Sequence, residues 1–214
     1  AQAVRRAELA AYIRATFRPL LDDQGRSEHL LWWDQARVAV WSTHAFFLGE
    51  AEDVAFGNTI LRYVRDDLAE PPGPNPFLAS APASVLALHG EKVAPDVREW
   101  ALDIVNRTCE FGMTRDYQFH GYNDNMPAKA TMSLILGGGL LKDGVAAHHG
   151  RFQLRQFAEQ LYRGGLNSEF NSPTYSALTL HAMAEIAEFA PEEQDREVAR
   201  AIERRLWADL ACHW

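Results

Sequence analysis

Apolar positions recur at helical spacing along most of the chain. One series consists of Val97, Trp100, Ala101, Ile104, Val105 and Thr108. Its intervals of three and four residues place these side chains on one face of an α-helix. Similar patterns predict helices over residues 30–48, 54–68, 151–162 and 175–189, and through Val198, Ile202, Leu206 and Leu210. No stretch shows sustained two-residue alternation between turns, so the sequence predicts an all-α protein.

Helix-breaking residues occur at regular distances. Asn75, Asn125 and Asn171 each stand one or two residues before a proline and open a segment rich in Ala, Leu, Ser and Thr. Their spacing of 50 and 46 residues is about the length of one helical hairpin. In each repeat a nearly apolar helix is followed by a more charged one. Because a helix that is apolar on nearly all sides must be covered on all sides, we expect an inner and an outer layer. We also expect the three asparagines at the same end of the array.

Composition narrows the class of protein. The chain has 214 residues, 47% of them hydrophobic, which is enough for a sizeable core in a single domain spanning residues 1–214. The net charge of −8 and the lack of a dense basic tract argue against nucleic-acid binding. The longest apolar run, residues 131–141, is far shorter than the roughly 20 residues that a membrane-spanning helix needs, so we expect a soluble protein. Cys109 and Cys212 form neither a disulfide framework nor a metal-binding pair, and no cofactor motif is visible.

Two phrases carry a resemblance to a known group of enzymes. They are YNDNMPAKATMSLILGG, residues 122–138, and EFNSPTYSALTLHAMAEIAEFA, residues 169–190. Together with the hairpin repeat, they resemble the (α/α) toroids of carbohydrate-active enzymes, which include heparinase- and alginate-lyase-like domains and six-hairpin glycosidases. The resemblance is one of pattern and phrase, and it covers most of the chain from about Leu30 onward. It implies an oligo- or polysaccharide substrate and a central cavity lined by the loops that enter the inner helices.

The ends of the chain add two expectations. The sequence contains roughly four hairpins and an N-terminal helix, whereas a closed toroid needs about six, so we expect either a toroid or an incomplete part of one. The apolar flank of residues 198–214, which includes Leu206, Leu210 and Trp214, is then expected to pack on a further hairpin or on a second subunit. The start, Ala-Gln-Ala, is typical of the mature side of a cleavage site and also of an arbitrary boundary. It favours a secreted or periplasmic protein.

The resemblance also suggests which residues act. Eliminative cleavage of a uronic-acid polymer needs a group that neutralises the substrate carboxylate, a base for the C5 proton and an acid for the leaving oxygen. Lyase-like toroids use an Asn, a His and a Tyr for these roles. Here Asn125 or Asn171 would take the first role, and His120 with Tyr175 or Tyr122 the other two. The further substrate-binding candidates are Tyr117, Asn123, Arg115, Lys129 and Trp33.

Three alternatives stay open. In a glycoside hydrolase, Asp124 and Glu169 would form the acid–base pair. In a non-catalytic helical-repeat domain, the concave face would bind a partner. Asn123, Asp124, Asn171 and Ser172 are also favoured helix caps, a role that needs no substrate. His44, His89 and His181 lie within apolar helices and are expected as hydrogen-bonded core or cavity residues rather than as metal ligands.

Overall fold

The computed structural model describes residues 2–27, 42–67, 76–115, 117–121 and 123–213, and within these ranges the chain is helical apart from short connections, with no β-strand. The all-α prediction is therefore confirmed for this part of the chain. The helices are α1 (Gln2–Phe17), α3 (Ala51–Asp67), α4 (Pro76–His89), α5 (Pro95–Thr114), α6 (Asn125–Leu141), α7 (Gly144–Gly164), α8 (Pro173–Phe189) and α9 (Glu193–His213). Two short 3-10 turns, η1 (Arg18–Leu20) and η2 (Gly90–Lys92), follow α1 and α4.

The helices begin and end close to the predicted positions. Most of the helix predicted over residues 30–48 lies outside the described residues, although residues 42–47 are helical. The helix predicted over 151–162 begins earlier, at Gly144, because the Asp143 carboxylate accepts hydrogen bonds from the backbone N–H groups of Val145 and Ala146.

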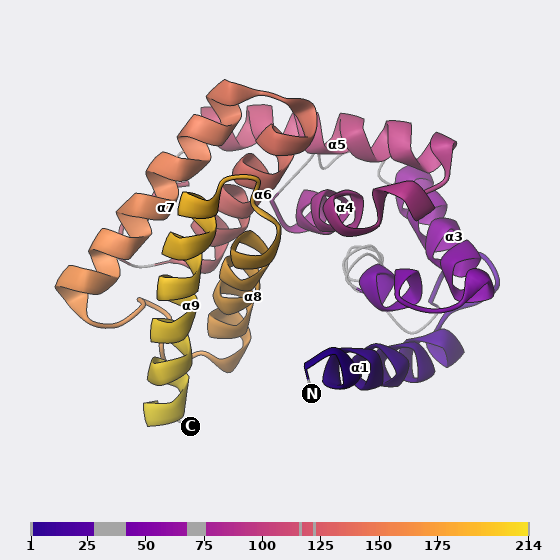
Figure 1. Ribbon diagram of the computed structural model, residues 1–214, viewed down its shortest axis with the longest axis horizontal. Helices are drawn as coiled ribbons and strands as arrows, with labels where there is room; N and C mark the ends of the chain where they lie inside the picture. Colours follow the sequence, from indigo (N-terminus) through magenta and orange to yellow (C-terminus); the bar gives the residue numbers. More distant parts are fainter. Residues whose placement is uncertain (1, 28–41, 68–75, 116, 122, 214) are drawn as a thin grey trace.

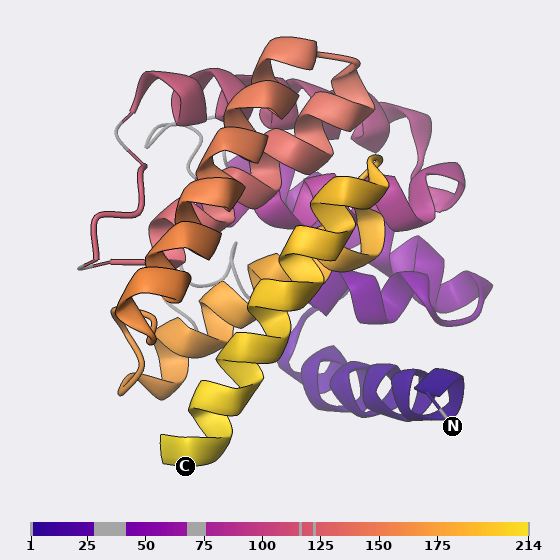
Figure 2. The ribbon, with the colours of Figure 1, turned by 60° about the vertical axis from the view of Figure 1, so that its left-hand side comes forward.

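The hairpins form two layers, as the sequence predicts. The apolar helices α4, α6 and α8 lie next to one another, and the more polar α5, α7 and α9 return along their outer side (Figures 1 and 2). Every residue from Pro127 to Gly138 of α6 is buried, because this helix is covered by α4, α5, α7 and α8. In Figure 1 the described hairpins follow an arc from α3 to α9, with α1 lying across its open side.

Two glycines allow the outer helices to approach α6 closely. A Cβ atom at Gly137 would lie 2.7 Å from the Sγ atom of Cys109 on α5. A Cβ atom at Gly150 of α7 would lie 3.0 Å from the backbone nitrogen of Ile135 on α6. Both distances are shorter than normal carbon contacts, so a larger residue at either position would push a neighbouring helix away.

The C-terminal helix differs from expectation. Leu206 is only 2% exposed and belongs to the main core, and Leu210 packs partly against the same core. Leu206 is covered within its own chain, because α9 packs on α7 and α8. Packing of the rest of this flank on a further hairpin or a second subunit stays a prediction. Trp214 lies outside the described residues. None of the described helices has both the length and the apolar character needed to cross a membrane.

Candidate functional site

The two polar loops that precede α6 and α8 meet at one end of the array. The Glu169 carboxylate of the second loop accepts hydrogen bonds from the backbone nitrogens of Asp124 (3.0 Å) and Asn125 (2.8 Å) and from the Asn125 side-chain amide (2.7 Å). Glu169 thus satisfies N–H groups at the start of α6, which have no partner within the helix. The prediction that Asn125 and Asn171 lie at the same end is confirmed, and Asn75 lies outside the described residues.

Asp124 ties the same two loops together from the other side. Its side chain is completely buried, and its two oxygens accept hydrogen bonds from the Ser168 backbone nitrogen (2.6 Å) and the Gln160 amide (3.1 Å). A catalytic acid or base must contact the substrate, which a carboxylate enclosed in this way does not do. Both carboxylates bond groups of the two loops, and the acid–base role of Asp124 and Glu169 stays a prediction.

Helix capping accounts for two more of the polar residues. The Asn123 side-chain oxygen accepts from the Met126 backbone nitrogen at 3.2 Å, and the Ser172 hydroxyl accepts from the Tyr175 nitrogen at 3.3 Å. Both side chains satisfy the starts of helices, as the capping alternative predicts. Asp124 is different, since its carboxylate bonds Ser168 and not its own helix.

Most of the remaining loop candidates among the described residues lie at the surface. His120 and Asn171 are exposed, and Tyr175 is half-exposed. Arg115 lies over the Phe111 ring at 5.1 Å, and the Tyr117 ring lies 5.9 Å from the same ring. Tyr122 and Trp33 lie outside the described residues. Within the described part of the chain, the polar side chains of these loops therefore mainly join the loops to each other and cap helices.

Asn125→Ala and Asn171→Ala test this interpretation of the loops. Asn125 is buried and bonds both Glu169 and Asn123, so its replacement should lower the free energy of unfolding by about 1–2 kcal/mol. Asn171 is exposed, and its replacement should change the same quantity by less than about 0.5 kcal/mol. Urea denaturation measures both values. Equal losses of stability in the two variants would contradict the structural role assigned to Asn125.

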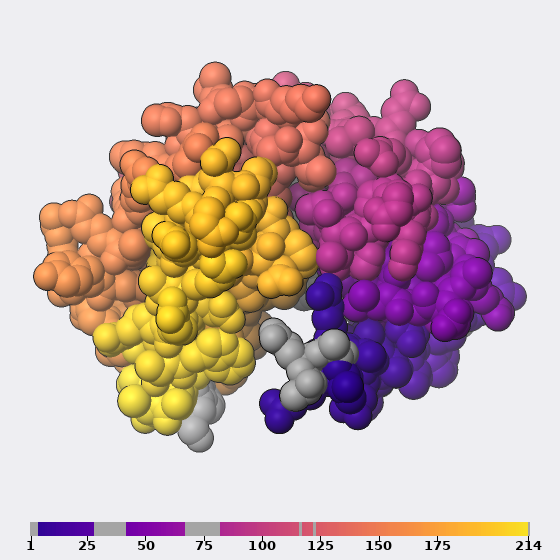
Figure 3. Space-filling model, in the orientation of Figure 1, coloured from indigo at the N-terminus to yellow at the C-terminus, as the bar shows by residue number. Residues whose placement is uncertain are grey.

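A cavity of about 460 Å³ lies elsewhere, on the concave side of the inner helices. Residues of α1, the segment 42–48, α4, α6 and α8 line it, and the space-filling view shows a recess between α1 and the α8–α9 hairpin (Figure 3). Most of its wall is apolar and includes Leu9, Ile13, Leu48, Leu88, Leu178 and Phe189. Among the described residues, its ionisable side chains are Arg6, His44, Lys129, His181 and Glu185. An apolar cavity with a few convergent polar groups is the typical form of a small-molecule site.

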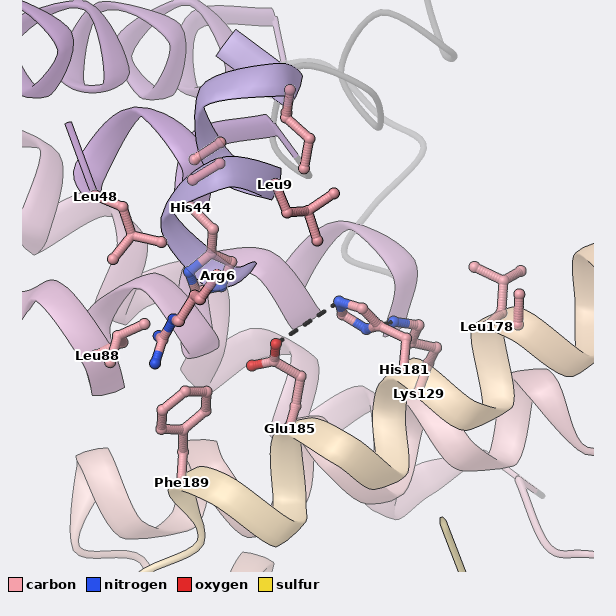
Figure 4. Close-up of a pocket in the computed structure, with 14 residues that line it drawn as sticks. Arg6, Leu9, His44, Leu48, Leu88, Lys129, Leu178, His181, Glu185 and Phe189 are labelled. Carbon is pink, nitrogen blue, oxygen red and sulfur yellow. Dashed lines mark hydrogen bonds and ion pairs between the residues drawn. The ribbon is translucent and has the colours of Figure 1, made fainter. Parts of the chain in front are cut away.

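Three of these ionisable groups follow one another in a line. Lys129 is 1% exposed, and its Nζ atom lies 2.7 Å from Nδ1 of His181. The Nε2 atom of His181 lies 3.7 Å from Oε1 of Glu185, one helical turn further along α8 (Figure 4). Lys129 enters from α6, so the neighbouring inner helices together supply an amine, an imidazole and a carboxyl group.

The surroundings of this line shift the pKa of each of its three groups. The Lys129 side chain is enclosed, whereas that of His181 is 48% exposed. Desolvation lowers the pKa of Lys129 to about 8, although the Glu185 charge acts in the opposite direction. Desolvation against the cavity wall lowers the pKa of His181 well below its ordinary value, and the charges of Lys129 and His44 lower it further. Burial raises the pKa of Glu185, partly offset by a hydrogen bond from Ser84 and by Lys129. At neutral pH the neutral imidazole of His181 can therefore accept a hydrogen bond from the Lys129 ammonium group.

Two further histidines complete the surroundings. The rings of His44 and His89 lie 5.7 Å apart, and burial lowers the pKa of each to about 4. His44 and His181 line the cavity, as the sequence suggests for residues of this kind. Across the residues that the structure describes, no group of three or more His, Cys, Asp or Glu side chains is placed to hold a metal ion.

No family model, curated protein or solved structure matches the chain. The function is therefore inferred from the geometry and chemistry of the site. The sequence names Lys129 as a substrate-binding candidate of the polar loops, and it does not single out Arg6 or Glu185. One signal was available: Lys129 is the only charged residue of α6. A lone charge within an otherwise uncharged buried helix indicates a polar cavity or a buried ion pair.

Proposed function

We propose that the protein is a carbohydrate-active enzyme that cleaves by β-elimination next to a carboxylate, and that the reaction takes place in the cavity lined by Lys129. The observation that carries the proposal is the 2.7 Å contact between Lys129 and His181 at the wall of this cavity. Perturbed ionisable groups that line a cavity are typical of catalytic sites. The resemblance of the hairpin array to toroid enzymes supplies the substrate class, a uronic-acid polymer or oligomer.

The cavity offers a group for each role that elimination requires. Arg6 carries the fixed positive charge that would bind the substrate carboxylate and stabilise the negative charge that develops beside it. Lys129 and His181 together would accept the C5 proton, since the lowered pKa of each makes its unprotonated form more accessible near neutral pH than in an ordinary lysine or histidine. Glu185, whose pKa is raised, would donate a proton to the leaving oxygen.

The test is incubation with a panel of uronic-acid polymers and short oligomers, followed by ultraviolet absorbance of the unsaturated product. We expect absorbance to increase with at least one substrate, and Lys129→Met to reduce the rate at least about ten-fold. Lys142→Met is the matched control, because Lys142 is exposed after the end of α6 and should leave the rate unchanged. New reducing ends without the absorbance would identify a hydrolase instead. Binding without either product would identify a non-catalytic carbohydrate-binding domain, in agreement with the largely apolar wall.

A further inference from the structure

Lys129, His181 and Glu185 lie in the order that activates a nucleophile in many enzymes: nucleophile, base and orienting group. A nucleophilic side chain is typically followed by a base within hydrogen-bond reach, and the base by a third group that orients it. Here the amine of Lys129 contacts Nδ1 of His181 at 2.7 Å, and the carboxyl group of Glu185 lies 3.7 Å from the opposite ring nitrogen. Figure 4 shows His181 and Glu185 on successive turns of α8, with Lys129 behind the imidazole.

We propose that Lys129 is an amine nucleophile that forms an imine with an aldehyde or ketone ligand carrying a carboxylate. This activity shares the cavity with the proposed elimination but does not rest on it.

The surroundings of Lys129 favour the neutral amine that such a reaction needs. The side chain comes from a helix without other charges and is 1% exposed, and leucine, isoleucine and phenylalanine side chains make up much of the cavity wall. Lysines that form imines are commonly activated by this kind of desolvation. An apolar wall also excludes water, which would otherwise hydrolyse the imine.

Each step can be written with the groups that are present. The amine nitrogen forms a bond to the carbonyl carbon, and one of its two protons passes through His181 to the carbonyl oxygen, which becomes a hydroxyl group. The nitrogen then gives up its second proton to His181, which returns it to the hydroxyl group as that group leaves as water. The products are an imine and one water molecule, with no oxidation or reduction. Glu185 stabilises the imidazolium that forms in between.

Arg6 selects the class of carbonyl compound. Its guanidinium lines the same cavity from α1 and has the geometry that binds carboxylates with two parallel hydrogen bonds. The volume of about 460 Å³ suits a small molecule. A short 2-oxo acid or an aldehyde acid satisfies both requirements, because its carbonyl group can reach Lys129 while its carboxylate faces the arginine.

The experiment traps the imine by reduction. The protein is incubated at neutral pH with glyoxylate or pyruvate and sodium cyanoborohydride, and the modified lysine is located by peptide mass mapping. We expect Lys129 to be modified at least ten-fold faster than Lys142, the exposed lysine of the same hairpin. Acetaldehyde, which lacks the carboxylate, should react more slowly than glyoxylate at Lys129.

Two variants complete the test. His181→Gln should slow the modification of Lys129 and leave that of Lys142 unchanged, whereas Lys142→Arg should leave Lys129 as reactive as before. The comparison of Lys129 with Lys142 is made in the unaltered protein. A low modification of Lys129 there cannot be caused by misfolding of a variant. Equal modification of the lysines, or none at Lys129, would overturn the proposal. Because the measurement is a mass change on one peptide, it is independent of whether elimination is observed.

Discussion

Lys129→Met is expected to raise the free energy of unfolding by about 3 kcal/mol at pH 7. In the folded protein the pKa of Lys129 is lowered from its ordinary value of 10.5 to about 8, because burial disfavours the ammonium form. A shift of this size corresponds to about 3 kcal/mol of unfavourable interaction whenever the lysine is charged. Methionine has similar length and no charge, so it removes the penalty while filling the same space.

The stability difference between Lys129→Met and the unaltered protein should depend on pH. Between pH 8 and pH 10.5 the unfolded chain binds more protons at Lys129 than the folded chain does, so the stability of the unaltered protein rises with pH across this window. Lys129→Met lacks this rise. Its advantage should therefore be greatest below pH 8 and disappear above about pH 10.5.

Urea denaturation at several pH values measures the difference. Lys142→Met should change the free energy of unfolding by less than about 0.5 kcal/mol at every pH, since Lys142 is exposed. A loss of stability in Lys129→Met at pH 7 would mean that the ammonium group is stabilised in the folded protein, contrary to the assigned direction of its pKa.

Glu169→Ala is expected to lower the free energy of unfolding by about 3 kcal/mol. The substitution removes three hydrogen bonds to a carboxylate and leaves two backbone N–H groups at the start of α6 without their partner. Hydrogen bonds to charged groups contribute about 1.5–3 kcal/mol each, and water replaces part of this contribution because the junction is only partly buried.

Glu169→Gln is the matched variant, since it keeps the length of the side chain and one acceptor oxygen. It should lose clearly less stability than Glu169→Ala. For a chain of this size the alanine variant should melt about 6–12 °C lower. An unchanged melting temperature in Glu169→Ala would contradict the role of Glu169 in joining the two loops.

The helices and their two layers follow from local sequence, whereas the cavity does not. Spacing of three and four residues in segments such as 175–189 reflects burial of one helix face, which every amphipathic helix shares. The repeated Asn and Pro residues likewise mark helix starts through local backbone chemistry, and these predictions agree with the structure.

The functions of Asp124 and Glu169 could not be predicted in the same way. A carboxylate in a polar loop can bond a substrate or another loop, and the partners that distinguish the two cases lie 36 to 45 residues away. Lys129 and His181 are 52 residues apart, and their contact depends on how α6 and α8 are rotated against each other. Hydrophobic spacing identifies the buried face of each helix, but it does not show which polar side chains meet across it.

The cap that Glu169 provides to α6 has a consequence for how the protein unfolds. In arrays of helical hairpins each repeat contacts only its neighbours, so terminal repeats tend to unfold on their own. Here the start of one inner helix is completed by a side chain from the loop that leads into the next. When the α8–α9 hairpin detaches, α6 loses its cap together with one of its packing surfaces. We therefore expect the two hairpins to unfold together. Hydrogen exchange should then show that amide hydrogens at the start of α6 are no better protected than those of α8.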